Sequence, residues 1–137
     1  MTTIERLANA VTFDQNCRYK IWDDTATLDS PEYHPGIDFY ADAAYSCSEG
    51  TVIAAGTDGD TFTVTVQQDV NTIFRYCHLE SISVRAGDYL QAGFIIGAAL
   101  DYVHFEFCTR DAENSKWCVR VGTEQYYKHD PLRAFKE

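Results

Sequence analysis

Hydrophobic and polar residues alternate with a period of two in several short runs of the chain. In residues 62–66, three apolar side chains fall on one face of an extended segment and two threonines on the other. Residues 102–107 alternate in the same way, with Val103, Phe105 and Phe107 on one face and Tyr102, His104 and Glu106 on the other. This period is typical of a half-buried strand, because successive side chains of a strand point to opposite faces.

Further strands are expected where short runs rich in β-branched and aromatic residues lie between turn residues. These runs cover residues 19–22, 51–55, 72–78, 81–84, 94–97 and 117–121, with turns at 58–60 and 69–71. Helix is expected only at the ends, as one or two amphipathic turns within residues 1–13 and a turn at 130–135. The pattern therefore predicts an all-β fold with minor helix, built from antiparallel sheet, over one domain of residues 1–137.

The charge balance narrows the classes of partner. Asp and Glu outnumber Lys and Arg by 21 to 11, which gives a formal net charge of −10. A surface of that sign repels phosphate backbones and anionic lipids, so binding of nucleic acid or insertion into a membrane is not expected. Residues 1–13 hold no uninterrupted apolar core, so no secretory signal is expected, and the protein would be cytosolic when made unless it is a fragment or something else carries it outside.

The five cysteines show no paired spacing typical of a zinc finger. Cys108 and Cys118 flank a polar segment and could be bridged across a hairpin in an oxidising compartment. Buried free thiols are an equally good interpretation.

Two imidazoles and a carboxylate form the most informative set of side chains. His34 and Asp38 lie four positions apart, and this even spacing places both on one face of an extended segment, while His104 lies on the polar face of a strand. Such a set suits zinc with an open fourth position, although ligand type alone also allows manganese. Glu106 is expected to support a ligand or the strand pairing, and His129 is expected to face solvent with no role.

The segment from His34 to Phe39 resembles the HxGxD segment of the lysostaphin-type (LytM-like) zinc endopeptidases. Further segments resemble the same family in the same order: residues 49–52, 75–82, 84–88, 91–97, 103–107 and 130–132. The resemblance places the core at about residues 33–108, with an N-terminal extension (1–32) and a C-terminal hairpin and tail (109–137). It implies the β-sandwich-like fold of lysostaphin-type peptidases.

The resemblance also implies roles for five residues. His34, Asp38 and His104 fall on the three zinc ligands, and His78 falls on a catalytic histidine. Tyr102 stands where the family has a second catalytic histidine, and a phenol with a pKa near 10 is a poor general base at neutral pH. Tyr102 is then either a hydrogen-bond donor to an oxyanion or a remnant of a lost active site. Only residues 98–102 connect the preceding strand to the histidine strand, shorter than the usual loop, so a more open cleft is expected.

The implied function is a zinc-dependent endopeptidase that cleaves cross-link or stem peptides of bacterial peptidoglycan. Without a recognisable signal, delivery by a phage particle is one route, so a virion-associated lysin with weakened activity is expected, either extracellular or on the virion. The alternative is a catalytically impaired structural or wall-binding module that keeps the fold and retains or loses the metal. Such a module would contact other phage tail or baseplate proteins.

Overall fold

A single long strand organises the sheet in the computed structural model, which describes residues 1–23 and 35–135. The elements in this part are, in chain order, α1 (Thr3–Thr12), β1 (Arg18–Lys20), β2 (Ile37–Tyr40), β3 (Ala43–Tyr45), β4 (Gly50–Asp58), β5 (Thr61–Gln67), β6 (Thr72–Ile82), β7 (Tyr89–Leu90), β8 (Ile95–Thr109), β9 (Cys118–Val121), β10 (Glu124–His129) and the 3-10 helix η1 (Pro131–Phe135). His34, the expected first metal ligand, lies outside the described residues.

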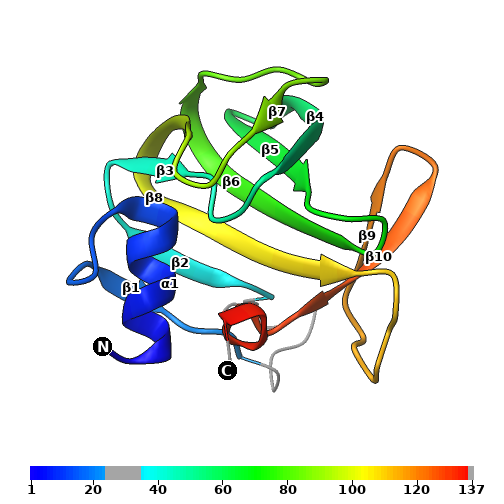
Figure 1. Cartoon of the computed structure of the whole chain (residues 1–137), viewed down its shortest axis with the longest axis horizontal. Coiled ribbons are helices and arrows are strands. Elements are labelled where there is room, and N and C mark those ends of the chain that lie inside the picture. The colour runs from blue at the N-terminus through cyan, green and yellow to red at the C-terminus, as the bar shows by residue number, and fades with distance from the viewer. Residues whose placement is uncertain (24–34, 136–137) are drawn as a thin grey trace.

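Strand β8 pairs with four neighbours, all antiparallel. One edge of β8 pairs with β6 from Ile82↔Gly97 to Thr72↔Thr109, and the sheet continues from β6 through β5 and β4 to β7. The other edge is shared by three short strands: β3 near the start of β8, β2 in the middle and β10 at the end. Figure 1 shows β8 crossing the molecule between these two groups. This arrangement brings residues from three distant parts of the sequence to one strand.

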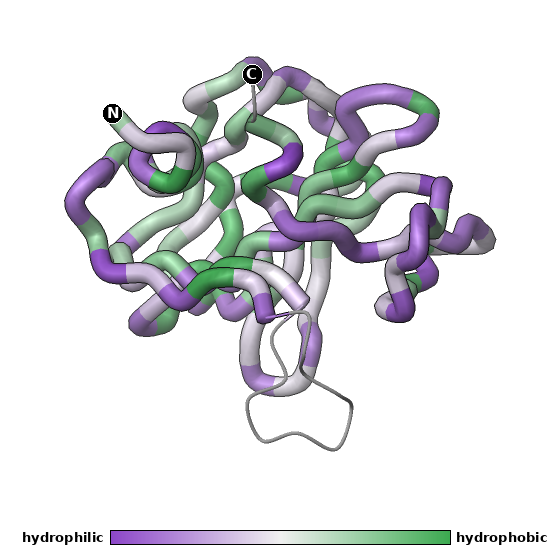
Figure 2. The backbone as a smooth tube through the Cα atoms, turned by 90° about the horizontal axis from the view of Figure 1, so that it is seen from below, coloured by the Kyte–Doolittle hydropathy of each residue, from purple (hydrophilic) through white to green (hydrophobic). Residues whose placement is uncertain are grey.

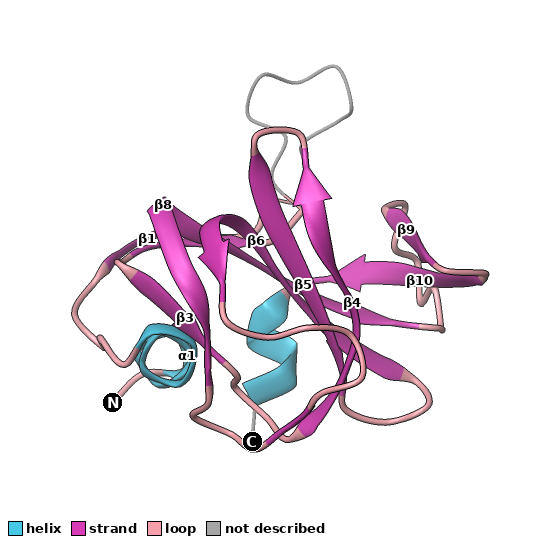
Figure 3. Cartoon of the chain, turned by 90° about the horizontal axis from the view of Figure 1, so that it is seen from above, coloured by secondary structure: helices cyan, strands magenta, loops and turns pink. Residues whose placement is uncertain are grey.

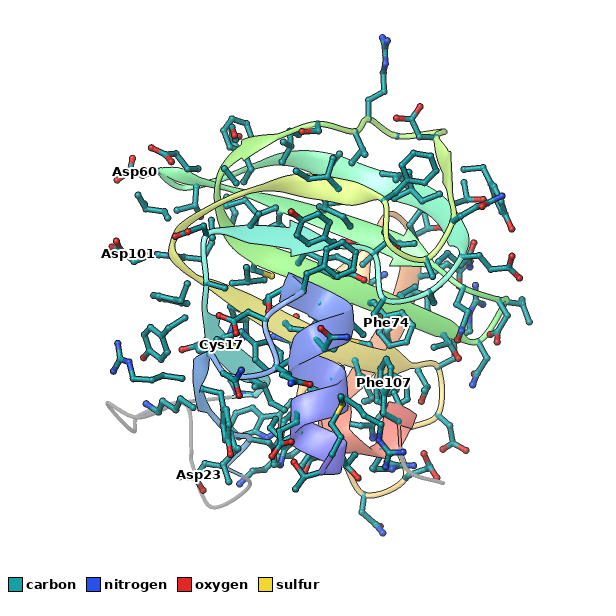
Figure 4. The ribbon with its side chains drawn as sticks, turned by 60° about the vertical axis from the view of Figure 1, so that its left-hand side comes forward. Cys17, Asp23, Asp60, Phe74, Asp101 and Phe107 are labelled. Carbon is teal, nitrogen blue, oxygen red and sulfur yellow. The ribbon has the colours of Figure 1, made fainter. Side chains whose placement is uncertain are left out.

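The apolar face of β8 builds the main core. Phe105 is fully buried, with ring centroids 5.7 Å from Phe74 and 5.4 Å from Tyr76, and Phe107 lies 5.7 Å from Phe74. Figure 4 shows Phe74 and Phe107 side by side. Helices α1 and η1 lie on this face of the sheet (Figures 1 and 3), and α1 contributes Leu7 to the core.

The hydropathy of the residues along the backbone matches this division between a buried core and an exposed surface. Figure 2 shows hydrophobic segments in the interior strands and hydrophilic ones in the turns at the periphery. Helix α1 begins with a capping box between Thr2 and Glu5 and ends at Phe13, whose φ is 60°. No helix in the described ranges is long and apolar enough to cross a bilayer.

The predicted all-β class with minor helix is confirmed, and so are the turn at residues 58–60 and the terminal helical turn. One expectation about an element is wrong. Residues 98–102 do not connect two separate strands, because β8 runs through them, with Ala98 and Ala99 paired to its neighbours. Within the expected C-terminal hairpin and tail, the sequence indicated no strand at Glu124–His129, where the structure has β10.

Two expectations about side chains are settled by the fold as well. His129 does not face solvent, because it is 4% exposed and its Nε2 lies 2.9 Å from the hydroxyl of Thr109. Arg133 approaches its other ring nitrogen at 3.0 Å. Cys108 and Cys118 are both free thiols, the first buried and the second exposed, so the bridge left open by the sequence is not formed.

Candidate metal centre

Strands β2 and β8 place a carboxylate directly beside an imidazole. Asp38 pairs with His104 in the antiparallel register, so both side chains leave the sheet on the same face. We call this face, which carries Tyr102, His104 and Glu106, the polar face. Asp38 Oδ1 lies 2.8 Å from His104 Nδ1, and the Asp38 residue is 8% exposed. Two of the three expected ligands therefore meet, as their positions in the sequence predict.

Gly36 lies against the imidazole of His104 and explains why this position of the motif is glycine. A Cβ atom built on Gly36 would lie 2.6 Å from the carbonyl oxygen of Phe105 and 2.8 Å from His104 Cε1. Any larger residue would push either the strand or the ring away. The absence of a side chain at position 36 thus fixes how closely β2 approaches the imidazole.

The other nitrogen of His104 is held by a second carboxylate. His104 Nε2 lies 3.0 Å from Glu106 Oε2, and Glu106 is 3% exposed. Glu106 also pairs with Arg75 of β6 and with Lys128 of β10, whose Nζ lies 2.9 Å from Oε2. The carboxylate is therefore surrounded by three basic groups on the polar face, and the ring of His104 is oriented from both of its nitrogens.

These contacts set the protonation states of His104 and Glu106. Burial alone would lower the pKa of His104, but the hydrogen bonds and charges of Asp38 and Glu106 outweigh it and raise the pKa to about 9. Burial would raise the pKa of Glu106, but His104, Lys128 and Arg75 together lower it well below its ordinary value. Without a metal, His104 is thus an imidazolium between two carboxylates.

The donor set fits a divalent metal at the Asp38 side of the imidazole. Tetrahedral ligand atoms at about 2.0–2.1 Å from zinc lie about 3.3 Å apart, so the observed 2.8 Å needs to open by only about 0.5 Å. Nδ1 of His104 would then be the ligand atom, and Nε2–H would donate to Glu106, the arrangement that orients metal-binding histidines. Within residues 1–23 and 35–135, no group of three His, Cys, Asp or Glu side chains is assembled for a metal. The third ligand expected, His34, falls in the part not described.

His78 and Tyr102 lie together on β6 and β8. Their rings stack with centroids 3.9 Å apart and planes 9° from parallel, and His78 Nδ1 lies 3.3 Å from the carbonyl oxygen of Tyr102. His78 sits at an irregularity of the β6–β8 pairing and has a φ of 65°, which is uncommon for a residue with a side chain. Such backbone conformations are concentrated at functional sites, where surrounding structure holds them in place.

Tyr102 remains a protonated phenol at neutral pH. Partial burial raises its pKa, and the negative charge of Asp38 raises it further. The ring of Tyr40 lies 5.7 Å from that of Tyr102 and completes an aromatic group beside the candidate metal ligands. Tyr102 can therefore donate a hydrogen bond but cannot act as a base.

Sequence reasoning did not identify Arg75 and Lys128 as parts of this centre. Each is a single basic residue in a strand, and nothing in its local pattern indicates a partner. Their role becomes visible only through the strand pairing, since Arg75 stands opposite Glu106 and Lys128 stands opposite Cys108. Buried carboxylates need counter-ions, so the alternation that placed Glu106 on the sheet could have prompted a search for them.

Comparison with known proteins gives one family and several structural matches. The family model described as Peptidase family M23 matches residues 32–115, more than half of the chain. No curated protein sequence matches.

Among solved structures, a chain of the SpoIIQ–SpoIIIAH pore-forming complex shares 20% identity, with 90% of this chain and 87% of that chain covered and a TM-score of 0.65. The antimicrobial peptidase lysostaphin of Staphylococcus simulans shares 21% identity, with 88% and 50% covered and a TM-score of 0.67. The catalytic domain of EnpA, a prophage-encoded M23 protein of Enterococcus faecalis, shares 21% identity, with 77% and 91% covered and a TM-score of 0.60.

At such identities, these structures show a common fold and nothing finer. They confirm the predicted lysostaphin-type architecture, and the family match confirms the resemblance found in the motifs. The chain belongs to peptidase family M23.

Proposed function

We propose that this protein is a zinc-dependent endopeptidase that cleaves peptides of bacterial peptidoglycan. One observation carries the proposal: Asp38 and His104 meet at 2.8 Å on the fold of an M23 peptidase. Both residues stand where the motifs place metal ligands, and His34 precedes Asp38 in the same motif. The ion pair with Glu106 behind His104 supplies the orientation that such a ligand needs.

The residues divide the work of hydrolysis between them. His34, Asp38 and His104 would hold zinc, which when bound polarises a carbonyl and lowers the pKa of water. His78 would accept or deliver a proton at the attacking water or at the leaving amine. Tyr102, held protonated by its surroundings, would donate a hydrogen bond to the oxygen that becomes negative during attack.

The matched structures support a cell-wall substrate and a phage origin. Lysostaphin is described as an antimicrobial peptidase, and EnpA as a prophage-encoded M23 protein. We extend this to the present chain as a virion-associated or otherwise extracellular lysin, with peptidoglycan as substrate and phage tail or baseplate proteins as further partners. The acidic net charge of −10 agrees with a protein that does not engage nucleic acid.

A digestion assay on purified cell walls tests the proposal. The protein with zinc should release new amino termini from sacculi, and His78→Ala should lower this rate by a factor of about 10² or more while zinc stays bound. Glu124→Gln, a change at an exposed residue that pairs with Arg110, serves as the matched control. Sacculi of several wall chemotypes that all stay intact would contradict the proposal.

One observation favours a second candidate, a structural module that has lost catalysis. Tyr102 replaces a histidine of the family motif, and loss of one such group removes a factor of about 10²–10³ in rate. A match to a chain of a pore-forming complex shows that this fold also occurs in an assembly. Tyr102→His separates the two functions: it should raise wall cleavage if the remaining site is competent, and leave it at zero if the protein is structural.

A further inference from the structure

A hollow of about 440 Å³ lies beside the candidate metal centre, on the polar face of the sheet. Its floor is formed by β4, β5 and β6, and its far wall by the hairpin of β9 and β10. Figure 3 shows this hairpin projecting past β4 and β5. Its lining residues include Gly56, Thr63, Thr65, Arg75 and Arg120.

Strand register places this hollow close to the bond that the proposed enzyme would cut. Arg75 pairs with Glu106 across β6 and β8, and His104 is two residues before Glu106 on the same face. Two residues of a strand span about 7 Å. We consider a substrate peptide that lies extended along the sheet with its scissile bond at His104. A side chain about two residues from that bond would then lie near Arg75.

Arg75 has donor capacity beyond its ion pair. Its Nη1 donates to Glu106, which is its one hydrogen bond among the described residues, and its Nε is buried without a partner there. The side chain is 16% exposed and lines the hollow. A guanidinium offers five N–H donors in a planar fork, so one carboxylate does not exhaust it.

The charge around the hollow is positive although the protein is acidic. Arg120, which is exposed on β9, lines the hollow together with Arg75. Lys128 pairs with the same carboxylate as Arg75, that of Glu106. Two acidic residues lie at or beside the hollow. The carboxylate of Glu106 already pairs with three basic groups, and Asp58 is one of the lining residues. A basic pocket within a chain of net charge −10 provides a local attraction for an anionic group.

The floor leaves room for a ligand group. Gly56 stands opposite Thr63 in the β4–β5 pairing, and Ala54 stands opposite Thr65. A Cβ atom added to Gly56 would meet nothing within 4 Å, so the strand there borders open space. Small residues on β4 and hydroxyl groups on β5 give a shallow polar floor between the two arginines.

From these features we propose that the hollow is a subsite for a carboxylate of the substrate peptide, held between Arg75 and Arg120 about two residues from the scissile bond. The inference rests on the proposed function in taking the polar face as the surface that binds peptide and in placing the scissile bond at His104; binding of the carboxylate itself does not require cleavage. Charge-assisted pairing with a guanidinium fork would give preference to acidic peptides over neutral ones.

Equilibrium binding tests this without any need for cleavage. Blocked Ala-Ala-Glu-Ala-Ala and its Gln counterpart are titrated into the full isotope-labelled chain with zinc, and backbone amide shifts are followed. We expect the Glu peptide to bind about tenfold more tightly, as one charge-assisted pair predicts. The shifts should centre on Gly56, Thr63 and Thr65, and the preference should shrink as salt rises to about 0.5 M.

Variants locate the effect. Arg120→Gln should reduce the preference for Glu several-fold, whereas Arg85→Gln, the same charge change on an exposed loop, should leave it intact. Gly56→Phe should weaken both peptides by filling the hollow with no change of charge. Arg120→Gln and Gly56→Phe both leave Arg75 in place. Loss of Arg75 would leave Glu106 short of a counter-ion and could unfold the protein.

Equal binding of the Glu and Gln peptides, or no binding of either, would overturn the subsite. So would an Arg85→Gln effect as large as that of Arg120→Gln, since the preference would then reflect net charge alone. Inorganic phosphate that shifts the same amides and displaces the peptide at equal concentration would assign the hollow to a free anion instead. Intact sacculi together with a clear preference for Glu would refute the proposed function and leave the subsite standing.

Discussion

Replacing Glu106 with glutamine removes the negative charge on which three basic groups converge. Glu106 is 3% exposed and contacts Arg75, Lys128 and His104. The side chains of Arg75 and Lys128 are only 16% and 12% exposed, so water cannot fully replace the lost partner. The amide keeps the shape of the carboxylate and can still accept a hydrogen bond.

The expected loss in the free energy of unfolding equals the cost of leaving a buried ion without its partner. Breaking such a pair from one side costs about 3–5 kcal/mol, and the amide places this variant near the lower end, about 3 kcal/mol. With a urea m-value of about 2 kcal/mol/M, the unfolding midpoint should fall by about 1.5 M. Glu124→Gln is the control, since Glu124 and Arg110 form a pair with side chains 52% and 38% exposed. Exposed pairs contribute about 0.2–1 kcal/mol, so its midpoint should fall by less than about 0.5 M.

Urea titrations of the wild type and both variants, followed by tryptophan fluorescence, give the comparison. An equal unfolding midpoint for Glu106→Gln and Glu124→Gln would show that the buried ion pairs of Glu106 contribute no more to stability than an exposed pair. Zinc affinity of the folded variant adds a second readout: loss of the group that orients His104 should weaken binding about 10–100-fold.

Three other changes probe separate parts of the structure. Gly36→Ala places a Cβ 2.6 Å from the carbonyl oxygen of Phe105 and 2.8 Å from the imidazole of His104. The free energy of unfolding should therefore fall by about 1–3 kcal/mol, and zinc affinity should fall with it. Unchanged zinc affinity would show that this contact does not fix the position of the ring. Phe105→Ala opens the centre of the core and should cost about 3–5 kcal/mol in urea unfolding, with a cost below about 1 kcal/mol arguing against the packing described. The protein environment raises the pKa of Cys47 and of Cys77 to about 12, which suppresses their thiolates at pH 8. Iodoacetamide should therefore modify the exposed Cys118 first and the half-buried Cys47 and Cys77 much more slowly, as mass spectrometry would report, and equal rates for the three thiols would contradict this.

Alternation and turn residues were sufficient to predict the class of fold. The run around Phe105 predicted which side chains enter the core, and the Asp58–Gly59 turn predicted the hairpin between β4 and β5. The same alternation put His104 and Glu106 on one face, which the structure confirms. These features are local, since they depend on residues within a few positions of one another.

Features that depend on pairing between distant segments could not be predicted in this way. Strand β10 is mostly polar in sequence and pairs with β8, while His129 is buried among groups distant in sequence, including Phe107 and Thr109. The assignment of Arg75 and Lys128 to Glu106 required the register of three strands. Tertiary contact decided each of these against the local signal.

The assignment of Asp38 and His104 as metal ligands is the claim on which the proposed chemistry depends, and the zinc content of purified protein tests it most directly. Elemental analysis after equilibration with a slight excess of zinc should find about one ion per wild-type chain, as an open three-ligand site predicts. His104→Ala, refolded and checked by circular dichroism, should retain less than about a tenth of that content, because one of the protein's ligands is lost. Wild-type protein without zinc, or a His104→Ala variant that binds as much as the wild type, would contradict the account.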